Sequence, residues 1–178
     1  MQQTRHRRSI RLQNYDYAQS GAYFVTICTQ HRACVLGEVV DGQMRLSELG
    51  LIAAQGWQWL AEQYAHVQLD AWVVMPNHLH GILVLTDDQP HEKGGSRTAP
   101  AVARKPVGRL VGAFKTVTTK QINALNEVAD DLLKPLFWQR NYHEHVVRNE
   151  ADLSRLREYV VNNPMKWVLD SLHPEYAR

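Results

Sequence analysis

The sequence contains few cysteines, no long apolar run and little net charge. Its two cysteines, Cys28 and Cys34, are too few for a disulfide framework and lack the spacing of a zinc site, so both are expected to be ordinary thiols. No segment approaches the ~20 apolar residues needed to cross a bilayer, and no apolar stretch follows the basic N-terminus as it would in a secretory signal. These absences predict a cytoplasmic protein without a membrane partner.

The length and composition are those of one folded domain. The chain has 178 residues, of which 44% are hydrophobic and 21% charged, which is enough for one good core and short for two. We expect a single domain over 1–178, with a basic N-terminal tail at 1–12 and a mobile basic loop at 87–105 that is unusually long for a compact domain.

Basic residues are segregated along the chain although the net charge is only +2. Residues 1–12 and 93–126 together carry eleven basic residues and no acidic one. Such clustering is typical of a surface that binds a polyanion, because contacts to phosphates release condensed counterions. A solvated tail and loop would show the same composition, so the charge does not decide between the two.

The pattern of apolar residues predicts an α+β fold. Strands are expected at 22–30, 67–75, 79–86 and 136–147, a hairpin at 34–46 with its turn at Asp41-Gly42, and helices beginning after Ser47, at Pro106 and after Asn149. Very short connections between neighbouring strands demand antiparallel pairing. The predicted architecture is a mostly antiparallel sheet covered by helices, in a ferredoxin-like arrangement.

Two histidines flank one apolar residue at the start of a buried strand. The alternation of a strand sends His78 and His80 to one face and Leu79 to the other, with the two imidazoles ~7 Å apart along the strand. Neutral imidazoles so placed are able to converge on one metal ion. A histidine pair at this spacing is by itself weak support for a metal site.

A rival pair, His143 and His145, surrounds Glu144. It too would place both rings on one face of a strand. The charged residue between them indicates a solvated strand near a sheet edge, whereas an apolar run follows His80. Burial therefore favours the first pair as the metal site.

The last helix adds a phenol and an amide. Tyr159 and Asn163 lie one turn apart on the same flank, beside the apolar stripe that includes Leu156 and Val160. A metal held by the first histidine pair and the Asn163 carbonyl would polarise a phosphate for attack by the phenol, which is a weak nucleophile while protonated. The simpler alternative is a core-edge tyrosine and a helix terminator before Pro164.

Two motifs in the expected order resemble those of the REP-associated tyrosine transposases, relatives of the single-tyrosine HUH transposases. The first is Met75-Pro76-Asn77-His78-Leu79-His80-Gly81, and the second is Tyr159-Val160-Val161-Asn162-Asn163-Pro164-Met165-Lys166. Further similarity lies in RRSIRLQNYDY, GAYFVTICT, GRLVGAFKTVTTKQIN and FWQRNYHEHVVRNE, so the resemblance covers about residues 7–170.

The resemblance implies cleavage and joining of single-stranded DNA on an HUH-type fold. In the family the histidine pair, here His78 and His80, holds a divalent cation, and a polar residue, here Asn163, completes the site. The tyrosine, here Tyr159, attacks a DNA phosphate to leave a 5′-phosphotyrosine and a free 3′-hydroxyl. The usual substrate is a palindromic hairpin with a flanking recognition sequence, so the protein would be nucleoid-associated when bound to DNA. Phosphate contacts are expected from Arg5, Arg7, Arg8, Arg11, Arg104, Lys105, Arg109, Lys115 and Lys120.

Several alternatives stay open on the sequence. The cation is expected to be Mg²⁺ or Mn²⁺, with tighter Mn²⁺ binding because imidazoles suit it better. The chain could instead be a hairpin-binding protein without activity, or a hydrolase that uses water with His143 or His145 as base. Tyr142 is the second candidate nucleophile. Whether the protein is a monomer or a homodimer, and whether the tyrosine serves its own chain's histidines, is undecided.

Overall fold

The computed structural model describes residues 15–87, 104–126 and 137–176. The predicted basic tail and most of the predicted mobile loop lie outside these ranges.

A four-stranded antiparallel sheet forms the centre of the fold. Its strands are β4 (Val67–Met75), β5 (His78–Leu85), β1 (Gly21–Cys28) and β6 (His143–Val146), in that spatial order. Leaving aside the hairpin β2–β3 and the final helix, the chain runs β-α-β-β-α-β, and the first of these strands lies between the third and the fourth. This is the ferredoxin-like arrangement predicted for an α+β fold.

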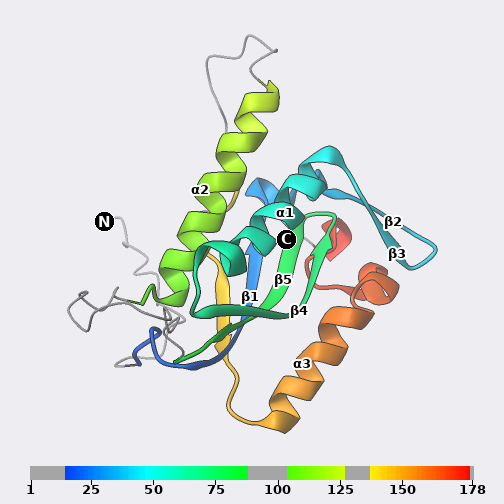
Figure 1. Cartoon of the computed structure of the whole chain (residues 1–178). Helices are drawn as coiled ribbons and strands as arrows, with labels where there is room; N and C mark the ends of the chain where they lie inside the picture. Colours follow the sequence, from blue (N-terminus) through cyan, green and yellow to red (C-terminus); the bar gives the residue numbers. More distant parts are fainter. Residues whose placement is uncertain (1–14, 88–103, 127–136, 177–178) are drawn as a thin grey trace, which may run out of the picture.

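Helices cover both faces of the sheet (Figure 1). Helices α1 (Glu48–Gln63) and α2 (Val107–Asn126) lie over one face, and α3 (Glu150–Asn162) lies over the other. Because side chains alternate along a strand, each face has its own apolar cluster. The larger cluster includes Tyr23, Leu79, Leu83, Trp57 and Phe114, and the smaller one contains Phe24, Ile82, Leu156 and Val160.

Two predicted helix starts are confirmed by their caps. The Ser47 hydroxyl accepts a hydrogen bond from the Gly50 amide at 3.1 Å. The Asn149 side chain accepts one from the Asp152 amide at 2.8 Å. Both bonds satisfy amides that have no partner inside the helix, and they fix where α1 and α3 begin.

Gly81 allows α1 to pack closely behind the histidine strand. A Cβ atom at this position would lie 2.4 Å from Cζ2 of Trp57. The indole therefore occupies the space that any other residue's side chain would need. This contact holds the middle of β5 against α1.

The hairpin forms as predicted, but it lies outside the main sheet. Within the described part of the chain, strands β2 (Gly37–Val40) and β3 (Gln43–Leu46) pair only with each other. Asp41 and Gly42 both have positive φ angles, of 52° and 73°, as the tight turn requires.

Strand β6 is much shorter than the predicted strand 136–147. Only His143–Val146 pairs with β1, and Trp138 forms an isolated bridge with Thr29. In the segment between these two contacts, Lys115 donates to the carbonyl oxygens of residues 139–141.

Short 3-10 segments complete the described chain. They are η1 (Gln30–Arg32), η2 (Pro164–Leu169) and η3 (Pro174–Tyr176).

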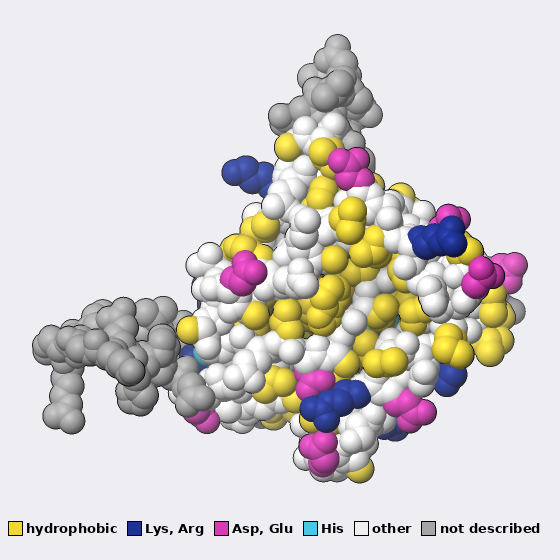
Figure 2. Space-filling model, turned by 45° about the vertical axis from the view of Figure 1, so that its right-hand side comes forward, with side chains coloured by type: hydrophobic (Ala, Val, Ile, Leu, Met, Phe, Trp, Pro, Cys, Tyr) yellow, Lys and Arg dark blue, Asp and Glu magenta, His cyan; other side chains and the backbone are white. Residues whose placement is uncertain are grey.

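Figure 2 shows hydrophobic side chains gathered across the middle of one face, with Lys and Arg at scattered positions. Exposed hydrophobic residues on α3 and η2 include Val161, Met165, Val168 and Leu169. Among the described residues, no helix combines the length and apolarity needed to span a membrane.

Candidate active site

The predicted histidine pair lies at the beginning of β5, on the face covered by α3. His78 is 0% and His80 3% exposed, and their ring centroids are 4.3 Å apart. Leu79 points into the larger core on the opposite face. The alternation expected of a buried strand therefore holds at this position.

Asp170, which the sequence analysis did not single out, joins the predicted histidine pair in one cluster. Its Oδ2 atom lies 3.9 Å from Nε2 of His78, and ligand atoms from His78, His80 and Asp170 all lie within 4.8 Å of one another. The carboxylate is buried and follows directly after η2. No sequence motif marked Asp170, because it reaches the site only where η2 turns back from the end of α3.

Asn163 lies beside this carboxylate. Its Nδ2 atom donates a hydrogen bond to Oδ2 of Asp170 at 3.2 Å. Its Oδ1 atom is buried and has no hydrogen-bond partner among the described residues. The amide thus holds the carboxylate and leaves its own oxygen, the atom predicted to bind the metal, available.

The donor set fits a divalent cation. Nε2 of His78 is buried without a hydrogen-bond partner in the described ranges, which is unfavourable unless another group binds it. Burial lowers the pKa of His78 to about 3, with the charge of Arg32 acting in the same direction. Burial and the neighbouring His78 hold the pKa of His80 well below its ordinary value. Both imidazoles are therefore neutral, as metal ligands must be.

Hydrogen bonds orient both imidazoles. Nδ1 of His78 donates to Oδ1 of Asn77 at 2.8 Å, and the Asn77 amide nitrogen donates to the carbonyls of Arg32 and Leu172. Because an amide oxygen only accepts, the His78 proton lies on Nδ1 and the lone pair on Nε2. Nδ1 of His80 is 2.8 Å from the Thr26 hydroxyl, which leaves its Nε2 facing the site.

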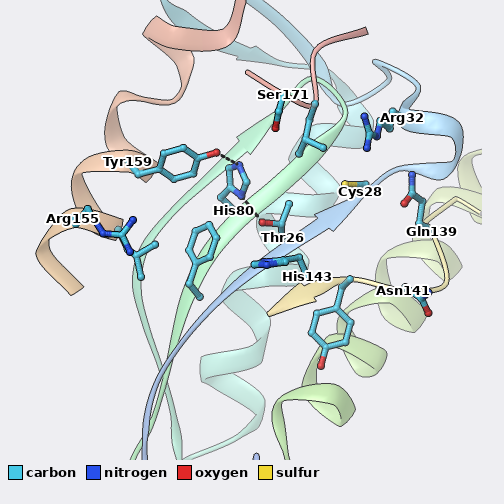
Figure 3. A pocket seen from close by; sticks show the side chains of 14 residues that line it. Thr26, Cys28, Arg32, His80, Gln139, Asn141, His143, Arg155, Tyr159 and Ser171 are labelled. Carbon is cyan, nitrogen blue, oxygen red and sulfur yellow. Dashed lines mark hydrogen bonds between the residues drawn. The ribbon is translucent and has the colours of Figure 1, made fainter. Parts of the chain in front are cut away.

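Tyr159 meets the cluster from α3. Its hydroxyl lies 3.2 Å from Nε2 of His80, as the dashed line in Figure 3 shows. The ring packs edge-on against Phe24 and His80, with 42% of the residue exposed. Burial raises the pKa of the phenol, and the charge of Asp170 acts in the same direction. The phenol is protonated near neutral pH and needs help to act as a nucleophile.

An ion pair fixes the helix that carries Tyr159. Arg157 binds both carboxylate oxygens of Asp70 on β4 with one edge of its guanidinium, through Nε at 2.9 Å and Nη2 at 2.7 Å. Leu156 and Val160 bury the adjoining face of the helix against the sheet. The Arg157–Asp70 ion pair and the packing of Leu156 and Val160 therefore fix the part of α3 that carries Tyr159.

The rival histidines have other surroundings. Nε2 of His145 lies 2.7 Å from Oδ2 of Asp152 near the start of α3. His143 is exposed and lines a cavity beside Tyr159. In the described ranges, the group able to hold a metal is the one built on His78 and His80, as burial predicted.

The predicted DNA-contact residues are dispersed. Arg5, Arg7, Arg8 and Arg11 lie outside the described residues. Arg104 pairs with Asp87 at 2.6 Å, Lys105 donates to the Tyr64 hydroxyl, and Arg109 and Lys120 are exposed on α2. Lys115 instead donates to three backbone carbonyls of its own chain. DNA contact by this set stays a prediction.

No family model matches the chain. A Haemophilus influenzae protein of uncharacterised function is 34% identical over 174 residues, which cover 94% of this chain and 93% of the relative. A second protein of that organism, named "Putative REP-associated tyrosine transposase", is 22% identical over 173 residues, or 91% of this chain and 86% of its own. A solved REP-associated tyrosine transposase bound to a REP hairpin superposes with a TM-score of 0.58 at 19% identity, over 88% of this chain and 73% of the other.

These similarities and the geometry agree. The antiparallel sheet and its covering helices share the fold of the solved tyrosine transposase. The chain belongs to one family with the uncharacterised Haemophilus influenzae protein, and it is similar to the REP-associated tyrosine transposases in fold and, more distantly, in sequence.

Proposed function

We propose that this protein is a metal-dependent nuclease and strand transferase that cleaves single-stranded DNA next to a hairpin, with Tyr159 as nucleophile. The observation that carries the proposal is the 3.2 Å distance between the Tyr159 hydroxyl and Nε2 of His80, within a buried cluster of two imidazoles and a carboxylate. The REP hairpin bound by the solved REP-associated tyrosine transposase, whose fold this chain shares, supports the choice of substrate class.

His78, His80 and Asp170 would hold the cation, with Oδ1 of Asn163 as a further donor. A bound divalent cation would draw charge from the scissile phosphate and favour attack at phosphorus. Two imidazoles favour Mn²⁺, whereas the carboxylate and amide oxygens also suit Mg²⁺. We propose that either ion supports activity and that Mn²⁺ binds more tightly.

Tyr159 performs the bond exchange. Its oxygen bonds to the phosphorus as the bond to the 3′-oxygen breaks. The phenol proton passes to solvent, which reaches the half-exposed side chain, and the departing 3′-oxygen takes up a proton. The products are a 5′-phosphotyrosine and a 3′-hydroxyl, and attack by a 3′-hydroxyl reverses the step without an external energy source.

Replacing one tyrosine at a time tests the nucleophile. Tyr159→Phe should bind a hairpin oligonucleotide with a labelled single-stranded flank as the unmodified protein does, but form no covalent adduct on a denaturing gel with Mn²⁺. Tyr142→Phe is the matched control, because Tyr142 lies near the same cavity. An adduct that persists in Tyr159→Phe and disappears in Tyr142→Phe would transfer the role to Tyr142. Cleavage products that bear no protein would indicate a hydrolase instead.

A further inference from the structure

A cavity of about 550 Å³ opens beside the Tyr159 hydroxyl. Strand β1, helix α3, the segment before β6 and the residues after η2 surround it (Figure 3). Its volume lies within the ~300–1,000 Å³ of pockets that hold small organic groups. His80 and Tyr159 both line it, so a group bound there would adjoin the proposed scissile phosphate.

One side of this cavity is apolar. Phe24 and Leu156 are each 6% exposed and form part of its lining, with the Phe24 ring beside Tyr159 and His80. A flat aromatic group would find a surface of matching polarity there.

Another part of the lining, from the segment before β6, presents two amide side chains. Gln139 and Asn141 line the cavity, and neither side chain has a hydrogen-bond partner among residues 15–87, 104–126 and 137–176. Each amide offers both a donor and an acceptor. The edge of a nucleobase requires this combination, and paired amide bonds are favourable with adenine in particular.

Lys115 holds the backbone of this amide segment. Its Nζ donates to the carbonyl of Gln139 at 2.7 Å and to those of Arg140 and Asn141 at 3.3 Å each. The backbone N–H of Gln139 also donates to the carbonyl of Cys28 on β1 at 2.9 Å. The main chain is thereby occupied within the protein, and the side-chain amides are left for a ligand.

We propose that this cavity binds one unpaired nucleobase adjoining the scissile phosphate, and that Gln139 and Asn141 read its edge. The base would pack against Phe24 while the amides select it. This inference rests on the proposed function, since it takes single-stranded DNA as the substrate. It makes the two amides determinants of flank sequence, separate from recognition of the hairpin.

Selection by binding tests the proposal without requiring cleavage. A hairpin oligonucleotide with short randomised single-stranded flanks would be bound to Tyr159→Phe protein, and the retained DNA sequenced. One flank position should be enriched for one base, with adenine expected. Adding Gln139→Ala or Asn141→Ala should reduce that enrichment by about five- to 100-fold, as expected for one bidentate contact. Gln63→Ala, an exposed amide at the end of α1 on the other side of the sheet, should leave it unchanged.

Enrichment that both cavity variants retain, or no enrichment at any flank position, would overturn the inference. A second measurement uses 2-aminopurine at the selected position. Its fluorescence should rise on binding to Tyr159→Phe protein, because the base leaves its stacked neighbours for the cavity, and it should rise less with Phe24→Leu. A rise without any covalent adduct from the unmodified protein would refute the proposed nuclease and leave the base pocket standing. Adducts without flank selection or a rise in fluorescence would refute the base pocket and leave the proposed nuclease standing.

Discussion

Asp170 Oδ2 lies 3.9 Å from His78 Nε2 and also accepts a hydrogen bond from Asn163. The carboxylate thus lies between the predicted histidine pair and the predicted amide ligand. It supplies negative charge to a cluster that otherwise has only neutral donors, and this charge would favour a cation.

Removal of that charge should weaken metal binding. Asp170→Asn keeps the side-chain size, and its Mn²⁺ affinity should fall at least about tenfold, because even groups that only orient metal ligands contribute 10–100-fold. Titration calorimetry measures the affinity, with Glu62→Gln on exposed α1 surface as the matched control. If Asn163→Ala weakens binding while Asp170→Asn does not, the amide rather than the carboxylate is the third ligand.

Thr26 should affect the metal through His80. Thr26→Val removes the hydroxyl that lies 2.8 Å from Nδ1 of His80 and nearly preserves shape. We expect about 10- to 100-fold weaker Mn²⁺ binding or slower adduct formation. Thr116→Val, which changes an exposed hydroxyl on α2, is the control. If Thr26→Val and Thr116→Val bind Mn²⁺ and form the adduct equally well, the His80 imidazole does not need the Thr26 hydroxyl as a hydrogen-bond partner.

The Asp70–Arg157 ion pair should position Tyr159. Asp70→Arg and Arg157→Asp should each slow adduct formation and lower Tm, whereas the double exchange should recover part of both. Recovery of Tm without recovery of the rate would indicate that the pair stabilises the fold but does not place the tyrosine.

The same ion pair makes the stability of the folded protein depend on pH. The hydrogen bond from Arg157 lowers the pKa of Asp70, so the folded carboxylate releases its proton more readily than the unfolded one. Its contribution to stability is therefore complete above the unfolded value of about 3.9 and is lost as pH falls through the lower folded pKa. Urea denaturation should be measured at neutral pH and at pH values below about 3.9. The loss of stability between the two should be smaller for Asp70→Asn than for the unmodified protein.

Activity should come from a single chain. Tyr159 contacts His80 of its own chain, so a mixture of Tyr159→Phe and His78→Ala proteins should form no more adduct than either alone. Recovered activity in the mixture would show that the tyrosine reaches a partner's histidines.

Lys115 and Arg109 should behave differently although both lie on α2. Arg109 is exposed, and Arg109→Ala should reduce the salt slope of DNA binding by about one if it contacts a phosphate. The Lys115 ammonium is already bound to three carbonyls. Lys115→Met should leave that slope unchanged and lower the free energy of unfolding by about 1–3 kcal/mol. A slope change for Lys115→Met alone would contradict this division.

Much of the site was predictable because its parts are local. Two-residue alternation placed His78 and His80 on one face, and helical spacing placed Tyr159 and Asn163 on one flank. The caps at Ser47 and Asn149 and the positive φ angles of the hairpin turn are also properties of short segments. The antiparallel α+β class followed from the short connections between strands.

Sequence alone thus determined which elements carry the candidate histidines, tyrosine and amide and which of these share a face, because those features depend on periods of two and 3.6 residues. Tertiary structure decided the rest. Asp170 becomes part of the cluster only when η2 folds back toward β5. Lys115 binds backbone rather than solvent only because α2 packs beside residues 139–141. These contacts join residues distant along the chain, and no local pattern encodes a distance that the packing of the sheet and its helices sets.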